Sequence, residues 1–225
     1  MKRRTPSTAR HRALASLAAR LAGEPGVAVY CGEGASHSWI WFADLLERLE
    51  TFDVRFLTHH DVLEGALETR DIMLVGGGDT YAMARSLGTD GARRLEEFVR
   101  GGGFYHGSCA GGYLVLRGVD MEPFTPFRLV DADMLNVMDD PPAPLCLEHK
   151  YLAPYGREWV FHPVYGEVAL LPRGPAPGML AFREAAEISA PLFGGPVMSA
   201  GEARSLADYA SAASRAAFLW PRERA

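Results

Sequence analysis

The chain has 225 residues, of which 48% are hydrophobic and 23% charged, a composition typical of a globular protein with an ordinary core. Its net charge of −5 and its pI near 5.8 exclude the basic face that phosphate backbones require, so we expect no nucleic-acid partner. No apolar run reaches the roughly 18 residues of a membrane span, so we expect no membrane partner.

The first 25 residues are interpreted as a basic extension ahead of the first strand. Basic residues at positions 2, 3, 4, 10 and 12 precede an apolar run over 13–19, which Arg20 interrupts. A basic amphipathic helix is our interpretation, and a secretory signal is the alternative. The three cysteines, Cys31, Cys109 and Cys146, are an odd and sparse set, which favours a reducing, cytoplasmic location over a disulfide framework.

Strand and helix patterns alternate through the first 117 residues. Ser38 is expected to cap the first helix of this region. Strands are predicted over 26–30, 53–58, 71–75 and from 104 to 106, and helices over 38–50, within 59–70 and over about 91–100. This alternation predicts a mostly parallel sheet covered by helices on both faces, a three-layer αβα sandwich of the flavodoxin-like type.

The second half has a less regular pattern. We predict a loop over 139–144, strands within 159–171 and within 186–198, and a final helix over 201–218. No repeat, long linker or second core is evident. The sequence therefore predicts one domain over residues 26–225.

Gly-rich loops follow three of the expected strands, after Tyr30, after Val75 and after His106. Sites of open parallel sheets lie beyond the carboxyl ends of the strands. The coincidence of three such loops at one edge predicts a functional site there.

The strongest chemical signal is the pentapeptide over 107–111, which reads Gly-Ser-Cys-Ala-Gly. It places Cys109 between an expected strand and an expected helix, in the pattern of a nucleophile elbow. The helix N-terminus favours thiolate over thiol, and the N–H of Ala110 is a candidate oxyanion donor. Gly111 lets the backbone pass closely. The alternative is a buried, inert cysteine in a Gly-rich turn.

Four segments together resemble a known family: VAVYCGEGAS, LVGGGDTYA, GGGFYHGSCAGGYL and LFGGPVM, in this order. They are similar to the biotin-protein ligase N-terminal domain-like family, a branch of the class I glutamine amidotransferase-like superfamily. The resemblance spans roughly residues 26 to 200. It implies the fold of that superfamily, with Cys109 as its elbow cysteine and Gly77 and Gly78, followed by Asp79, as its oxyanion or substrate-binding loop.

The resemblance implies a catalytic histidine that is oriented by an acid. The usual His-Pro-Glu signature is altered here, because His162 and Pro163 are followed by an acid only at Glu167. His162 and Glu167 are the candidate base and acid, and a surface or packing role for His162 is the alternative. The chain ends at Ala225 and lacks the Gly-Arg-rich biotinyl-adenylate motif of the ligase, so we do not expect biotinylation.

Weaker candidates lie elsewhere in the chain. Glu33 follows the first strand and is a candidate acid near Cys109, with a solvated loop carboxylate as the alternative. His106 and His149 are minor candidates for a base. His59, His60 and Asp61 are better explained by a helix N-cap at Asp61 than by a metal site, and no cluster has the spacing of a zinc site. The glycines at 76–78 lack the Gly-Lys-Ser/Thr ending of a P-loop, so we expect no nucleotide.

The sequence leaves three functions open. The first is a cysteine-dependent amidohydrolase or acyl-transfer enzyme that acts on a small-molecule substrate. The second is a non-catalytic binding or regulatory domain with a degenerate triad, and the third is a redox-sensing thiol protein of the DJ-1 kind. We expect no cofactor and no metal, and the sequence leaves a homodimer open.

Overall fold

The computed structural model describes residues 23–50, 52–117, 122–134, 137–138, 152–155, 158–161, 166–173, 187–192, 195, 198–204 and 206–209. The chain divides into two compact units, one of residues 1–115 with 120–129 and one of residues 116–119 with 130–225. Each unit is described by itself. The single domain expected over 26–225 stays a prediction.

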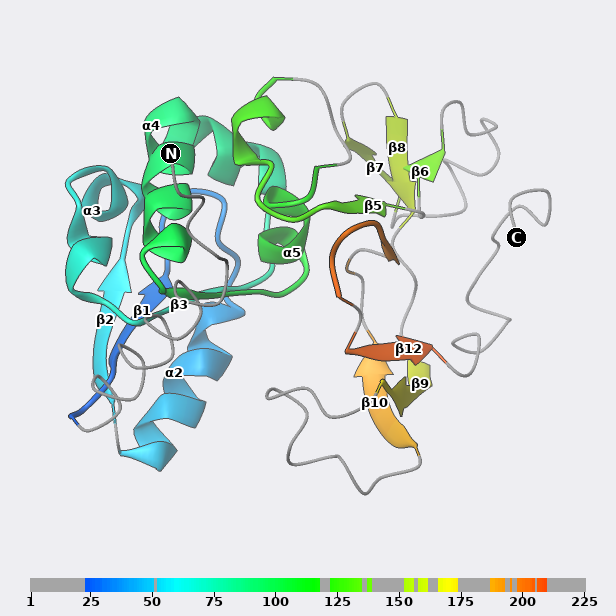
Figure 1. The fold of residues 1–225 in the computed structure, drawn as a ribbon, viewed down its shortest axis with the longest axis horizontal. Helices are drawn as coiled ribbons and strands as arrows, with labels where there is room; N and C mark the ends of the chain where they lie inside the picture. The colour runs from blue at the N-terminus through cyan, green and yellow to red at the C-terminus, as the bar shows by residue number, and fades with distance from the viewer. Residues whose placement is uncertain are drawn as a thin grey trace, which may run out of the picture. The chain divides into compact units, whose positions relative to one another are not determined.

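A four-stranded parallel sheet forms the centre of the first unit (Figure 1). Its strand order is β2-β1-β3-β4, and all three neighbouring pairs are parallel. The strands are β1 (Gly26–Tyr30), β2 (Asp53–Leu57), β3 (Ile72–Val75) and β4 (Phe104–Gly107). The apolar runs of the sequence therefore form the strands that were expected of them, and the α/β fold is confirmed.

Helices cover both faces of this sheet, as the figure shows. Val27 and Val29 of β1 pack with Leu46 of α2 (Trp39–Leu49) on one face. Val75 of β3 lies against Gly111 of α5 (Ala110–Leu114) on the other face, where α5 also contacts α4 (Thr80–Arg100). Alternate side chains of one strand point to opposite faces, and the central strand β1 is buried along its whole length, whereas the edge strands β2 and β4 are largely exposed or half-buried. This arrangement confirms the three layers.

Helix α4 is longer than expected, because the sequence predicted only residues 91–100. Asp79 caps its first turn and accepts hydrogen bonds from the amides of Tyr81 and Ala82, at 2.9 and 3.1 Å. Gly88 interrupts the helix with φ 58° and ψ −164°. A glycine with positive φ breaks the helical periodicity. The residues of α4 before Gly88 therefore lack the continuous apolar pattern that predicts a helix.

The short helix α3 (His59–Leu63) corrects a second expectation. Its N-cap is Thr58 rather than Asp61. Asp61 is the third helical residue, and its carboxylate accepts hydrogen bonds from the amide and the hydroxyl of Thr58, at 2.7 and 2.6 Å. The two residues form a capping box, which satisfies two orphan donors reciprocally. The 3-10 turn η1 (Ala66–Thr69) follows before β3.

The second unit contains antiparallel strand pairs. β5 (Ala132–Met134) pairs with β11 (Met198–Ala200). β8 (Glu158–Phe161) pairs with β6 (Val137–Met138) and β7 (Leu152–Tyr155). β9 (Gly166–Pro172) pairs with β10 (Ile188–Leu192) and β12 (Ala207–Tyr209). The strands expected within 159–171 and 186–198 are confirmed.

The final helix expected over 201–218 is wrong where the structure describes that segment. Ala207–Tyr209 forms β12, with Tyr209 opposite Leu170 of β9. Pairing with a distant strand overrides the helix propensity of an alanine-rich run. Residues 210–218 and the loop predicted over 139–144 lie outside the described residues.

Candidate functional site

Cys109 lies at the turn between β4 and α5, at the carboxyl edge of the parallel sheet. Its backbone has φ 52° and ψ −114°. Among the described residues only one other non-glycine, Glu50, has a positive φ, and Glu50 ends helix α2. Such a conformation costs on the order of 1–3 kcal/mol and persists only where surrounding contacts impose it.

Two glycines provide those contacts. A Cβ on Gly107 would lie 2.4 Å from the carbonyl oxygen of Gly111, and one on Gly111 would lie 2.3 Å from that of Val75. The amide of Ser108 donates to Val75 O at 2.9 Å, and the amide of Gly111 donates to Gly76 O at 3.0 Å. The turn is therefore fixed against the end of β3 by main-chain contacts that only glycine permits.

The hydroxyl of Tyr105 adds a further restraint on this turn. It donates to the carbonyl of Gly111 at 2.8 Å, from the strand that leads into the turn. Burial raises the pKa of Tyr105, with a smaller contribution from Tyr30. The phenol therefore stays protonated, and remains a donor, throughout the range in which a thiol is active.

Cys109 faces the Gly-rich loop after β3. A Cβ on Gly77 would lie 3.5 Å from Cys109 Cβ, 3.7 Å from Cys109 Sγ and 3.5 Å from Ser38 Oγ. These are ordinary van der Waals distances. The cysteine sulfur and the serine hydroxyl therefore both lie within 4 Å of the position that a Cβ on Gly77 would occupy.

Ser38 holds the loop rather than capping α2 with its side chain, which corrects the capping prediction. It occupies the N-cap position of α2 without a side-chain cap hydrogen bond. Its Oγ instead accepts from the amide of Gly77 at 2.8 Å and donates toward Gly77 O at 3.3 Å. Ser36 donates to Ser38 Oγ at 3.0 Å. The contact to Gly77 spans 39 positions, so no local pattern could have revealed it.

The loop glycines have different hydrogen-bonding roles. Gly77 N–H is occupied by Ser38, whereas the amides of Gly78 and Ala110 make no hydrogen bond within the described residues. Gly78 has φ 151°, and a Cβ there would lie 2.0 Å from Gly34 O. Asp79, expected as part of a substrate-binding loop, uses its carboxylate to cap α4 and its amide to bind Gly34 O at 2.8 Å. The amides of Gly78 and Ala110 are the donors that remain available.

Glu33 is exposed in the loop after β1. Its carbonyl accepts from Tyr30 Oη at 2.9 Å, and its amide donates to His59 Nδ1 at 3.4 Å. These contacts place its backbone beside β1 and β2. Cys109 follows β4, which lies two strand positions from β1 in the sheet. A role for the Glu33 carboxylate near the sulfur stays a prediction.

His106 lies on β4, with its ring 5.9 Å from the ring of Phe42 in an edge-on contact. Partial desolvation by the surrounding chain lowers the pKa of His106. The imidazole is therefore neutral at pH 7 and directed to the face of the sheet that α2 covers. Cys31, at the end of β1, has a pKa raised first by burial and then by the negative charge of Asp61.

Other predicted residues cannot be joined to this site. His162, Cys146 and His149 lie outside the described residues, and Glu167 belongs to β9 of the second unit. His59 and His60 stack with ring centroids 4.1 Å apart, and Asp61 is committed to Thr58. Within the described part of the chain, no group of three or more His, Cys, Asp and Glu residues could hold a metal ion.

A family model matches the part of the chain that includes the Cys109 turn. Residues 26–127 match the family model described as "Biotin-protein ligase, N terminal". The match runs from β1 through the Cys109 turn to η2 (Thr125–Phe127), and it confirms the resemblance for that part of the chain.

Among solved structures, the chain is similar to a Thermoplasma acidophilum protein that is described as a GMP synthase subunit. The identity is 13% and the TM-score 0.44, with 78% of this chain and 67% of that chain covered. No curated protein matches the chain. No helix in the described residues is long and apolar enough to span a bilayer.

Proposed function

We propose that this chain is a class I glutamine amidotransferase-like protein in which Cys109 acts as the nucleophile of an amidohydrolase or acyl-transfer reaction. The observation that carries the proposal is the backbone of Cys109, held at φ 52° between β4 and α5. The amides of Gly78 and Ala110 lie on the two adjoining segments and have no hydrogen-bond partner among the described residues. Strained backbone of this kind concentrates at functional sites, and a thiol on such a turn is presented beyond the sheet edge.

The reaction begins when the Cys109 thiolate attacks the carbonyl carbon of a small amide or ester. A sulfur–carbon bond forms, and the carbonyl π electrons move to oxygen, where Gly78 and Ala110 N–H groups stabilise the negative charge. Collapse of this intermediate breaks the bond to the leaving group, which departs with a proton. Water then hydrolyses the thioester, or an acceptor amine takes the acyl group.

Proton transfer is the role proposed for His162, with Glu167 as its orienting acid. The thiol proton passes to the imidazole and then to the leaving group. Helix α5 has only five residues, so activation by a helix macrodipole is weak here. The base therefore carries more of the activation than in a site with a long helix behind the cysteine.

The first test measures thiol reactivity. We expect iodoacetamide at neutral pH to label Cys109 of the folded chain faster than Cys31, because the raised pKa of Cys31 leaves little thiolate there. Peptide mass mapping assigns the rates, and C31S serves as the matched control that keeps fast labelling. Equal labelling of Cys31 and Cys109 would count against an activated Cys109.

The second test measures acyl transfer with 4-nitrophenyl acetate as a probe. The chain should release a burst of nitrophenol that C109S abolishes and C31S retains. H162A should slow turnover, and the C109A/H162A double variant should lose little more than either single variant, because such residues act as a unit. A burst that survives in C109S would remove the cysteine from the reaction. Ligand binding without any burst would favour the binding-domain alternative.

A further inference from the structure

A cavity lies where β3 and β4 begin, at the end of the sheet opposite to Cys109. It has a volume of about 200 Å³. Its wall comes from the turn around η1, from the last turns of α4 and from the glycine turn before β4. The lining residues that bear on its chemistry are Leu67, Glu68, Arg70, Arg94, Glu97 and Phe98. Strands that run parallel place their first and last residues at opposite edges, so this cavity is separate from Cys109.

Arg70 forms a fixed part of the wall. Its side chain is only 5% exposed, and its Nη1 donates to Asp53 Oδ2 at 2.7 Å. Its Nε donates to Thr69 Oγ1 at 3.3 Å. A guanidinium committed in this way stays in place when a ligand enters, and its charge makes the cavity favourable for a carboxylate.

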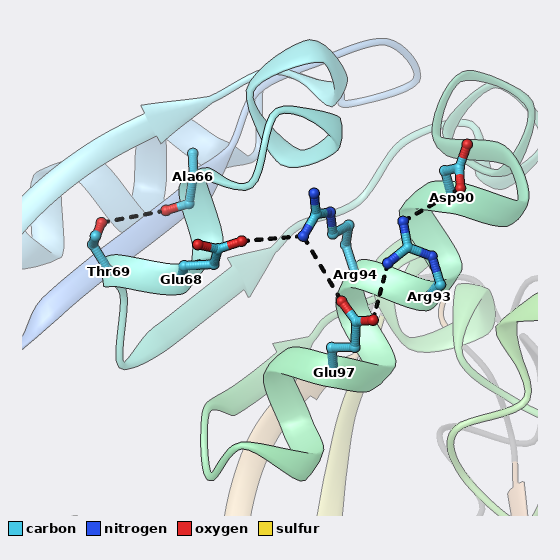
Figure 2. A network of polar contacts seen from close by, with 7 residues as sticks. All are labelled: Ala66, Glu68, Thr69, Asp90, Arg93, Arg94 and Glu97. Atoms are coloured by element: carbon cyan, nitrogen blue, oxygen red, sulfur yellow. Dashed lines mark hydrogen bonds and ion pairs between the residues drawn. The ribbon is translucent and has the colours of Figure 1, made fainter.

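Arg94 has unused hydrogen-bonding capacity. Figure 2 shows that its contacts to Glu68 and Glu97 are made from one end of the guanidinium. Both use Nη1, at 3.1 and 3.8 Å. Nε is buried without a partner, and Nη2 has none among the described residues. Nε and Nη2 together form the edge with which arginine binds a carboxylate through two parallel hydrogen bonds.

Glu68 is a weak competitor for this arginine. Its side chain is 72% exposed, and an exposed ion pair contributes little to stability. The left-handed turn at Gly65 leaves room for the carboxylate, because a Cβ there would lie 3.0 Å from Glu68 Oε1. The carboxylate of Glu68 thus lies on the Nη1 side of Arg94, where its charge would repel a ligand carboxylate, and it can swing into solvent when one arrives.

We propose that this cavity binds a small organic carboxylate with a short apolar tail. The carboxylate pairs with the Nε–Nη2 edge of Arg94 after a small rotation of the guanidinium, which gives the buried Nε an acceptor. Leu67 and Phe98 line the same space and contact the tail. Glu68 is displaced on binding, and Glu97 keeps its hydrogen bond to Arg93 at 2.9 Å.

The test uses the full chain with butyrate as the probe and butyramide as its neutral isostere, by titration calorimetry. Butyrate should bind at least about tenfold more tightly than butyramide. R94Q should weaken butyrate binding by about tenfold or more, and R94K should do the same, because lysine keeps the charge but lacks the paired edge. E68Q should strengthen binding by removing the competing carboxylate.

Matched controls decide between this site and general electrostatics. Arg48 of α2 pairs with Asp44 and does not line the cavity, so R48Q should bind butyrate like the wild type. C109A should also bind normally, which separates this proposal from the reaction proposed for Cys109. Thermal unfolding checks that each variant is folded, and E68Q remains informative if R94Q is not. Equal losses in R48Q and R94Q, equal affinities for butyrate and butyramide, or no butyrate binding would overturn the proposal.

Discussion

The two edges of the parallel sheet are built by different means. At the carboxyl edge, glycines let two segments of the main chain approach each other closely, because a Cβ on Gly111 would lie 2.3 Å from Val75 O. At the amino edge, a Cβ on Gly103 would meet the ring of Phe98 at 2.4 Å, which is a side chain, and charged pairs surround it. Main chain cannot move aside as a ring can. The carboxyl edge should therefore be the more sensitive to substitution, and the amino edge the more sensitive to salt.

The largest expected effect comes from G111A compared with G103A. Both add one methyl at nearly the same distance from the nearest atom. G111A should destabilise the fold by about 3 kcal/mol, at the upper end for overpacking, because its methyl meets the carbonyl of β3. G103A should cost about 1 kcal/mol, since Phe98 can rotate. Urea unfolding of both variants measures the difference. Gly111 lies in a helix, where alanine is intrinsically favoured, so a stabilised G111A would refute the close contact.

The next effect isolates the Ser38 hydroxyl. S38A leaves the Gly77 amide without its acceptor and should cost about 1–2 kcal/mol, because an unsatisfied donor in a partly buried loop is expensive. S36A removes the bond from Ser36 Oγ to Ser38 Oγ and the longer bond, at 3.3 Å, from the amide of Ser38 to Ser36 Oγ, and should cost about 0.5 kcal/mol. The loop beside Cys109 loosens in S38A, so its iodoacetamide labelling rate should change while that of S36A stays near wild type. Identical stabilities for the two variants would contradict the assignment of Ser38 as the residue that holds the loop.

These residues show which parts of the site could be predicted from sequence. The strand over 26–30 and the turn at Cys109 follow from local patterns, an apolar run and glycines at fixed offsets. Ser38 was misread because the rule for N-caps is local, whereas its partner Gly77 lies 39 positions away. Asp79 caps α4, and the place in a substrate-binding loop that the family resemblance implies for it stays a prediction. Where the structure describes it, the helix expected over 201–218 is wrong for a similar reason. β12 forms because it pairs with β9, and no local pattern reveals a pairing with a distant strand.

A smaller effect tests the capping box at the carboxyl end of β2. T58A removes the cap of α3 and should cost about 1 kcal/mol at neutral pH. The hydrogen bond from the Thr58 side chain is the main cause that lowers the pKa of Asp61 below its ordinary value of 3.8. A depressed carboxyl pKa stabilises the folded chain above pH 3.8, and that contribution is lost as pH falls through the folded value.

The effect of pH on the stability of T58A follows from the lowered pKa of Asp61. The difference in unfolding free energy between wild type and T58A should shrink as pH is lowered from about 5 to about 2, because Asp61 becomes protonated in both. Chemical denaturation at a series of pH values gives the difference directly. The control is the same substitution in a D61N background, because the difference between D61N and T58A/D61N contains no Asp61 titration and should not vary in this pH range. A difference that grows on acidification would show that Thr58 does not stabilise the ionised carboxylate.

The smallest effect is expected at the amino edge, for R93Q. Arg93 pairs with Glu97 at 2.9 Å and with Asp90 at 3.4 Å, all three side chains being at least half exposed. Glu97 is the main cause that raises the pKa of Arg93, but the guanidinium is charged at neutral pH with or without that shift. Solvent and salt screen such pairs, so R93Q should leave the unfolding midpoint unchanged within error, and any small loss at low salt should disappear at about 1 M salt. G111A should keep its full loss under the same salt, because a steric overlap is not screened. Parallel denaturation of both variants at low and high salt therefore measures the contrast between the two edges. A loss of stability in R93Q that persists at high salt would contradict this prediction, because it would show that an exposed ion pair stabilises the fold.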